Sequence, residues 1–413
     1  MIRKTILIVL TGLLLLNICQ GLAFAQAKGE ATAQSQIQNE QQKKDRLDQA
    51  IKYQKEKNIH FFVDQGYSIL VLVLFLFLGL SALLRRQIEK ITRKCFWVVF
   101  FYALVFIILA FIVGLPSSYY GFHLEQKYQL SNQNFFQWFG EQLLGLLVVG
   151  IIGVLVIEGI YFALRKAPRT WWIYVSIVFV FFMVLLINLA PVLIMPLFNT
   201  YTPLPQGEIR DKLISLSEKA GVKVEGIYEM NMSKQTKEAN AMFTGLGNTK
   251  RIVLGDNLVK EYTPDEIEVV IAHEMGHNVL QHIWKMIALM SFVSAIGFLI
   301  IHLTMGEIIN RYKAQLKIEG PADIAGLPLF MLIFVVFGLI TLPVSPTYSR
   351  YLEHQADKYA LDLTHKPDAF ISAMNKLAYQ NLSDPNPSSV IEFLLYDHPP
   401  ASKRIKFAET YIK

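Results

Sequence analysis

The chain has 413 residues, of which 53% are hydrophobic and 17% are charged, the composition of a polytopic membrane protein. The formal net charge of +6 does not call for a nucleic-acid partner. Much of that charge lies in short loops beside apolar segments, where membrane topology explains it. Cys19 and Cys95 are the only cysteines. Because Cys19 lies in an N-terminal leader, no intramolecular disulfide is expected in a mature chain.

The N-terminus has the pattern of a targeting segment. Two basic residues precede an apolar run from Ile6 to about Leu22, and a small-x-small triplet ends at Ala25. Residues 1–25 are therefore expected to be a signal peptide, which we favour, or an uncleaved first transmembrane helix. Residues 26–62 are polar and rich in Gln, Lys and Glu, and they predict a solvent-exposed leader rather than a catalytic domain.

Further along the chain, about six segments are apolar and long enough to span a membrane. They lie near 66–84, 96–115, 143–164, 171–195, 286–305 and 327–345. We expect an N-terminal transmembrane region over 63–198. A second region over 199–413 would contain the last two spans.

The part between the fourth and fifth spans has a mixed pattern. Its first apolar stripe, with helical spacing, predicts a helix that ends at Gly221. The stripe consists of Ile209, Leu213, Leu216 and Ala220. Residues 224–230 and 251–255 predict short strands. The fold class expected is mainly α, with transmembrane helices in a bundle or in a barrel around a chamber, and a small α+β domain.

The motif with the clearest chemistry is His-Glu-x-x-His at 273–277. On a helix, residues four apart share a face, so His273 and His277 can bind one metal ion. Zinc accepts such ligands, and a catalytic zinc site keeps one position open for water. Glu274 lies where a carboxylate can take the proton of that water. The alternative is an amphipathic helix whose two histidines face water.

The residues before this motif predict that it lies on a helix. Thr263 has the features of an N-cap, Pro264 follows at the first helical position, and Glu266 completes a capping box. An apolar stripe from Ile267 to Ile271 then has helical spacing.

Two histidines need a third ligand, and the segment 349–357 offers one. It contains no helix breaker, and Arg350, Glu353 and Asp357 lie on one helical face. Glu353 could complete the zinc ligands, and Asp357 could accept a hydrogen bond from a ligating histidine. We place Arg350 with Asp357 among the residues around the ligands. Spacing alone leaves open a surface helix with a solvated charged face.

Basic residues gather in alternate loops between the expected spans. They are Arg85, Arg86, Lys90, Arg93 and Lys94, then Arg165, Lys166 and Arg169, then Arg311, Lys313 and Lys317. Lys127 is the only lysine or arginine in the loop 116–141. Positive-inside counting places the basic loops in the cytoplasm and both metal-ligand segments on the outer face. Lys55 and Lys57, just before the first span, argue weakly against this orientation.

Several motifs occur together, in a fixed order, at 115–120, 124–128, 196–205, 240–243, 250–254, 273–277, 349–357 and 397–400. From about residue 97 to the C-terminus, the chain thereby resembles the type 1 CAAX prenyl proteases, which are integral-membrane zinc metallopeptidases. The resemblance implies a zinc metallopeptidase domain over 199–413 with one zinc ion per chain. It places the ligands at His273, His277 and Glu353, and the general base of peptide hydrolysis at Glu274.

The resemblance also implies roles for four further residues. Asn240 and Ala241 match an edge strand that holds the substrate backbone, an arrangement that gains main-chain hydrogen bonds whatever the sequence bound. His398 matches a histidine that stabilises the oxyanion of the transition state. Arg404 matches a family position for which an active-site role and an anchoring role both stay open.

The chain departs from the family at its N-terminus and in its charge pattern. Eukaryotic members face their active site toward the cytosol, whereas the basic loops here place it outside. A bacterial inner-membrane enzyme with an outward active site is therefore expected. Its substrate would be an envelope or membrane protein or peptide, lipidated ones included. Two other classes stay open, a metal-binding transporter, for which Glu158 inside a span gives thin support, and a non-catalytic scaffold.

Overall fold

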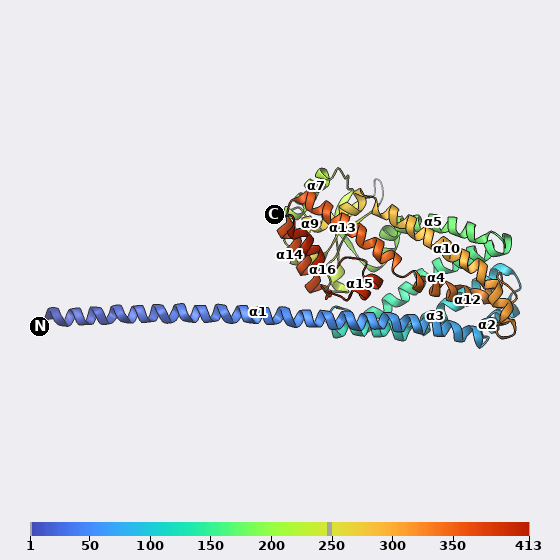
Figure 1. Cartoon of the computed structure of the whole chain (residues 1–413), viewed down its shortest axis with the longest axis horizontal. Helices are drawn as coiled ribbons and strands as arrows, with labels where there is room; N and C mark the ends of the chain where they lie inside the picture. The colour runs from blue at the N-terminus through green and yellow to red at the C-terminus, as the bar shows by residue number, and fades with distance from the viewer. Residues whose placement is uncertain (1, 246–249, 413) are drawn as a thin grey trace.

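The computed structural model describes residues 2–245 and 250–412, with side chains described from residue 40 onward. Its most extended element is the helix α1 (Ile2–Phe77), whose C-terminal part packs along the rest of the molecule (Figure 1). The signal peptide or first transmembrane helix expected at 1–25 and the beginning of the polar leader lie outside the described side chains. Those expectations stay predictions.

Five helices of the described part are long and apolar enough to cross a membrane. They are α1 from Glu40 to Phe77, α3 (Cys95–Lys127), α4 (Phe135–Lys166), α5 (Trp171–Leu189) continued to the end of α6 (Met195–Phe198), and α10 (His282–Arg311). A sixth span results if α12 (Leu327–Ile340) and α13 (Val344–Thr364) are counted with the turn before them, as one span bent by 48°. The expected polytopic helical fold is confirmed.

The first span differs from the expected 66–84. Helix α1 ends at Phe77, and Gly79 adopts a left-handed conformation with φ 70°, which glycine reaches without steric cost. The short helix α2 (Leu80–Ile91) then begins. Arg85 on α2 is buried and forms an ion pair with Asp323, which precedes α12. We expected Arg85 in a basic cytoplasmic loop between the first two spans, but it lies on α2 and its charge is neutralised inside the protein.

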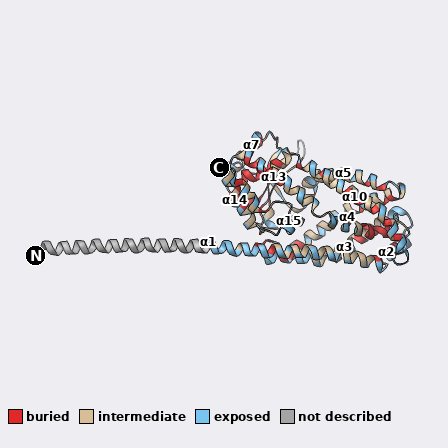
Figure 2. Cartoon of the chain, viewed as in Figure 1, coloured by how far each residue is buried: buried red, intermediate tan, exposed pale blue. Residues whose placement is uncertain are grey.

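Buried residues concentrate toward the two ends of the molecule (Figure 2). Of the two larger cores, one surrounds the sheet and α9 (Pro264–Val279), and the other joins α1, α3, α10 and α12. The basic connections α2, α4–α5 and α10–α12 all lie at the end opposite the sheet and α9 (Figure 1). The metal-ligand segments and the basic loops are therefore separated by the length of the spans.

The sheet has four strands in the order β1-β2-β4-β3. They are β1 (Tyr201–Pro203), β2 (Gly226–Met230), β3 (Ala241–Thr244) and β4 (Arg251–Gly255). Strands β2 and β4 are parallel and the other pairs are antiparallel. Two strands were expected near β2 and β4, and the expected helix is α7 (Glu208–Lys219). Because β3 ends the strand order, Ala241 lies on an edge strand.

The remaining helices surround this sheet. They are α8 (Asp256–Glu261), α9 (Pro264–Val279), α14 (Pro367–Gln380), α15 (Ser389–Leu395) and α16 (Ala401–Glu409). The short helix α11 (Lys313–Leu316) lies instead at the end of the spans away from the sheet. Both hydrogen bonds of the expected capping box are present, because Thr263 N–H donates to Glu266 and Glu266 N–H donates to Thr263 Oγ1. Ile267 and Ile271 are fully buried in the core beneath α9. The helix is thus fixed by its cap and its apolar stripe.

Candidate metal centre

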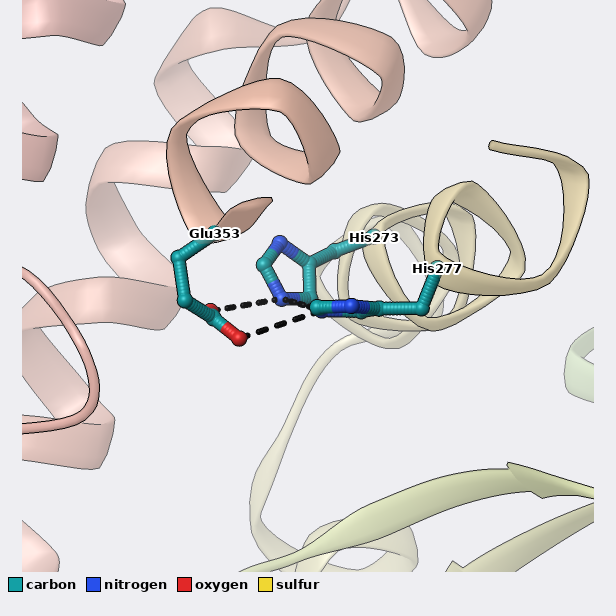
Figure 3. Close-up of side chains that lie close together, drawn as sticks. All are labelled: His273, His277 and Glu353. Atoms are coloured by element: carbon teal, nitrogen blue, oxygen red, sulfur yellow. Dashed lines mark hydrogen bonds and ion pairs between the residues drawn. The ribbon is translucent and has the colours of Figure 1, made fainter. Parts of the chain in front are cut away.

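Side chains from two helices, α9 and α13, converge on one point (Figure 3). His273 and His277 project from one face of α9, and Glu353 reaches them from α13. His273 Nε2 lies 3.2 Å from Glu353 Oε2, and His277 Nε2 lies 3.2 Å from Glu353 Oε1. The potential ligand atoms of these three residues all lie within 4.8 Å of one another. The structure therefore joins the two segments that sequence spacing could not connect.

The chemistry of this donor set fits a metal ion. Two imidazole nitrogens and one carboxylate oxygen are typical protein ligands of a catalytic zinc, which leaves a further position open. Glu353 is 4% exposed, and its Oε2 atom, although 3.2 Å from His273 Nε2, accepts no well-aligned hydrogen bond from the described residues. A buried carboxylate oxygen without a hydrogen bond is costly unless a cation compensates it. The arrangement is a metal site typical of zincins.

Asp357 holds the ring of His273 from the side away from the other ligands. Its Oδ1 atom lies 2.8 Å from His273 Nδ1, so the ring N–H donates to the carboxylate and Nε2 faces Glu353. Burial by itself lowers the pKa of His273, but Asp357 and Glu353 outweigh it and raise that pKa to about 10. The surroundings that favour a proton on His273 equally favour a metal cation near it.

Arg404 on α16 anchors this carboxylate. Its Nε donates to Asp357 Oδ2 at 2.9 Å, and one terminal NH2 group donates to Oδ1 at 2.5 Å. Such a two-point contact fixes the plane of the carboxylate. Of the two roles left open by the sequence, this geometry favours anchoring, because Arg404 acts on His273 mainly through Asp357.

His398, in the segment between α15 and α16, approaches the same oxygen atom of Glu353 as His273. Its Nε2 is 3.5 Å from Glu353 Oε2, and its Nδ1 is 2.9 Å from Asp397 Oδ1. Burial lowers the pKa of His398, but the nearby carboxylates of Asp397 and Glu353 raise it by more. The net shift of the pKa is therefore upward. A ring in its charged form has two donors, which suits contact with a developing negative charge.

The side chain of Arg350, on the helix that carries Glu353, contacts backbone carbonyls of the neighbouring segment, and its expected place among the residues around the ligands stays a prediction. It donates to the backbone carbonyl oxygens of Glu392 at 2.7 Å and of Tyr396 at 2.5 Å. A cation at the C-terminal end of α15 interacts favourably with the carbonyl oxygens at the negative end of the helix dipole. Arg350 therefore ties α13 to the segment that leads into His398.

A cavity of about 660 Å³ opens beside the ligands. Its lining combines His273, Glu274 and His398 with Asn240 and Ala241 at the start of the edge strand. Glu274, the expected base, thus faces the same space as the strand expected to hold a peptide.

Part of the cavity wall comes from α1, in the segment that the sequence predicted to be a solvent-exposed leader. Gln54, Lys57, Asn58 and Phe61 line the same space. Gln54 also donates to the carbonyl oxygen of Leu382 at 2.8 Å.

Two further contacts hold α1 against the catalytic side. Arg46 donates to the carbonyl oxygen of Tyr379 at 3.1 Å. Ala50 and Tyr53 are 3% and 2% exposed, in a small core with Leu124 and Leu382. The polar composition of this segment gave no signal for the docking, because only one narrow face of the helix is buried.

These elements define a class of protein. The site is that of a zincin-type metallopeptidase, since a His-Glu-x-x-His helix, a glutamate from a second helix and an edge strand meet at one cavity. The spans make the protein a multi-pass membrane metalloprotease. The chain belongs to peptidase family M48, whose model matches residues 203–412. A second model, described as the CAAX prenyl protease N-terminal region of five membrane helices, matches residues 28–200.

Similar proteins come from bacteria and fungi. The chain is 30% identical to the uncharacterized metalloprotease YhfN of Bacillus subtilis, over 87% of this chain and 84% of that protein. It is 31% identical to CAAX prenyl protease 1 of Saccharomyces cerevisiae, over 72% of this chain and 69% of the relative. The crystal structure of S. mikatae Ste24p shares the fold with a TM-score of 0.78 and 24% identity, covering 88% of this chain and 89% of that one. The resemblance inferred from the motifs is confirmed.

Proposed function

We propose that this protease is a zinc endopeptidase that cleaves extended segments of membrane-associated or envelope proteins. One observation carries the proposal. His273, which forms the metal site with His277 and Glu353, lines one cavity together with the carboxylate of Glu274 and the start of an edge strand. This combination suits hydrolysis of a peptide bond within a bound chain.

The chain's own residues have distinct roles in this proposal. His273, His277 and Glu353 would hold a zinc ion, which supplies a Lewis acid that polarises a water molecule and the scissile carbonyl. Glu274 accepts the proton of the attacking water and later delivers it to the leaving amine. His398 donates a hydrogen bond to the oxygen on which negative charge develops.

The edge strand supports an extended substrate. Gly255 N–H donates to Asn240 O at 2.9 Å, and Ala241 is paired in register with Leu254. Backbone groups alternate in direction along an antiparallel strand, so those of Ala241 point away from β4 toward the open edge. A peptide in β conformation can add to this edge through main-chain hydrogen bonds. The substrate segment must therefore be unfolded locally.

Replacement of Glu274 by Gln provides the test. The detergent-purified protein and the Glu274→Gln variant would each receive an unstructured peptide and its prenylated counterpart, and zinc content would be measured in parallel. Glu261→Gln, an exposed carboxylate at the end of α8, is the matched control. We expect cleavage by the wild type and the control, loss of at least about 100-fold in Glu274→Gln, and zinc retained in all three.

Equal inactivity of the wild type and Glu274→Gln, with zinc bound, would argue for a metal-binding transporter or a scaffold instead. The ratio of cleavage between the two peptides reports whether a prenyl group contributes to binding. Selective cleavage of the prenylated peptide would count against envelope proteins as the substrate class.

We also propose that the active site faces the outside of a bacterial inner membrane, because the basic connections lie at the opposite end of the spans. Cys95 is exposed at that basic end. In a Cys19→Ser background, a membrane-impermeant maleimide applied to spheroplasts should leave Cys95 unlabelled. It should label a Thr410→Cys variant at the catalytic end once Cys95 is also replaced by Ser. The reverse pattern would place the active site in the cytoplasm.

A further inference from the structure

A third histidine lies against the metal site. His282 is the first residue of α10 and is 2% exposed. Helix α9 ends at Val279, and Gln281 adopts a left-handed conformation with φ 58°. This sharp break folds His282 back toward His277, so that their ring centroids are 5.0 Å apart at an interplanar angle of 81°.

His282 contacts the side of His277 that faces away from Glu353. The two Nδ1 atoms lie 3.1 Å apart, whereas His277 Nε2 lies 3.2 Å from Glu353 Oε1. The other ring nitrogen of His282, Nε2, lies 3.1 Å from Gln355 Oε1. Gln355 follows Glu353 by two residues on α13. A chain of two hydrogen bonds thus connects α9, α10 and α13 next to the ligands.

The direction of this chain follows from the chemistry of imidazole. A neutral imidazole carries one N–H, and a nitrogen that binds a metal must keep its lone pair. If His277 offers Nε2 to the metal, its proton is on Nδ1 and is donated to His282 Nδ1. His282 then carries its own proton on Nε2 and donates it to Gln355 Oε1. Each acceptor needed is present at hydrogen-bond distance.

We propose that His282 is a positioning residue of the metal site, which fixes the tautomer and ring orientation of His277 through a relay that ends at Gln355. His282 has for His277 the function that Asp357 has for His273. The two ligands differ in one respect, because His273 meets a carboxylate anchored by Arg404 and His277 meets a neutral ring. The inference rests on the proposed function, in that the site must bind a metal.

The relay predicts which replacements of His282 preserve metal affinity. In His282→Leu the acceptor for His277 Nδ1–H is lost. In His282→Asn the amide Oδ1 atom occupies about the position of ring Nδ1 and can accept the same hydrogen bond. Gln355→Leu leaves both rings in place and removes the final acceptor. Loss of such outer partners typically lowers metal affinity by about 10- to 100-fold.

Zinc affinity, measured by competition with a chromophoric chelator in detergent, is the main readout. We expect a loss of about 10- to 100-fold in His282→Leu, a smaller loss in Gln355→Leu, and affinity close to the wild type in His282→Asn. His354→Leu is the matched control, because this exposed histidine of α13 packs its ring on Phe407. The thermal unfolding midpoints of the metal-free proteins show whether His282→Leu has a folding defect. Gln355→Leu tests the same hydrogen bonds with both imidazole rings in place.

Absorption spectra of the cobalt-substituted proteins separate positioning from direct ligation. A positioning role predicts the same coordination number in the wild type and His282→Leu. A changed coordination number would make His282 a ligand and overturn the proposal, as would zinc binding by His282→Leu as tight as in the wild type. If the wild type itself binds no zinc, the proposed function fails together with this inference. A changed coordination number, or unchanged zinc affinity in His282→Leu, would overturn only this inference and leave the proposed function intact.

Discussion

Gly276 of α9 and Ala356 of α13 meet almost backbone to backbone. A Cβ atom added at Gly276 would lie 3.3 Å from Ala356 Cα and 3.1 Å from the ring atom Cδ1 of Tyr359. Gly276 precedes the ligand His277, and Ala356 is three residues after the ligand Glu353. The absence of a side chain at position 276 therefore sets how closely the two ligand-bearing helices approach.

Replacement of Gly276 by Val should separate the helices and weaken the site. Overpacking of this kind costs about 1–3 kcal/mol, and relaxation of α13 away from α9 would move Glu353 from the histidines. We expect zinc affinity and peptide cleavage each to fall by about 10-fold or more, as a 1.4 kcal/mol change in binding free energy implies. Equilibrium dialysis against zinc would measure the first effect.

Gly150→Val is the matched control, because Gly150 lies within α4 and a Cβ there would meet no atom within 4 Å. Its zinc affinity should equal that of the wild type. If Gly276→Val also bound zinc normally, the helix approach would not limit the metal geometry.

Asp357→Asn tests the hydrogen bond to His273. The amide can still accept from the ring but lacks the charge, so it supports the metal-binding tautomer less strongly and leaves Arg404 without its counter-ion. We expect zinc affinity to fall by about 10- to 100-fold. Asp362→Asn, an exposed carboxylate of the same helix paired with Lys358, should have no effect. Equal affinities in the two variants would remove Asp357 from the metal site.

The docking of α1 gives a prediction for substrate binding. Ala50 is 3% exposed, whereas Ile51 on the next face of the helix is 43% exposed. Ala50→Arg places a large cation in the contact, displaces α1 and opens the cavity wall that contains Lys57 and Phe61. We expect the KM for a peptide to rise several-fold while zinc affinity stays unchanged. Ile51→Arg is the control, and a raised KM in both variants would indicate a general effect of charge.

The sequence predicted those parts of the site that depend on local periodicity. His273 and His277 are four residues apart on a capped helix, and Glu353 and Asp357 are four apart on another, so each pair's shared face follows from helix geometry. Periodicity places Arg350 on the same helical face but does not predict the contacts of its side chain. Its long side chain extends along α13 to carbonyls of α15, and residue spacing does not encode that direction.

The parts that the sequence could not predict depend on contacts between distant segments. Arg46 and Tyr379 are 333 positions apart, and no pattern in either segment indicates their contact. His282 follows a break in the helix at Gln281, so helical spacing from His277 no longer applies there. The family resemblance supplied Asn240 and His398, which have no local signature of their own.

The capping box of α9 gives a pH-dependent stability. Glu266 is buried, and burial raises its pKa, but hydrogen bonds from Lys376, Ser372 and Thr263 N–H outweigh this and hold the pKa below its ordinary value. The folded protein therefore binds fewer protons at this group than the unfolded chain in the acidic range. The stabilisation by Glu266 is complete above the ordinary pKa of 4.5 and is lost as the pH falls through the lower folded value.

Replacement of Glu266 by Gln should remove this dependence. At pH 7 the variant should unfold at a lower temperature than the wild type, because the charge-assisted contact to Lys376 is lost. As the pH falls from 4.5 through the lower pKa of the folded state, the two midpoints should converge, since the wild type then loses the same contact by protonation. Thermal unfolding in detergent with a chelator present would measure both, so that release of zinc in acid does not contribute. A difference in midpoint that stays constant as the pH falls from 7 to well below 4.5 would show that Glu266 stabilises α9 by shape and not by charge.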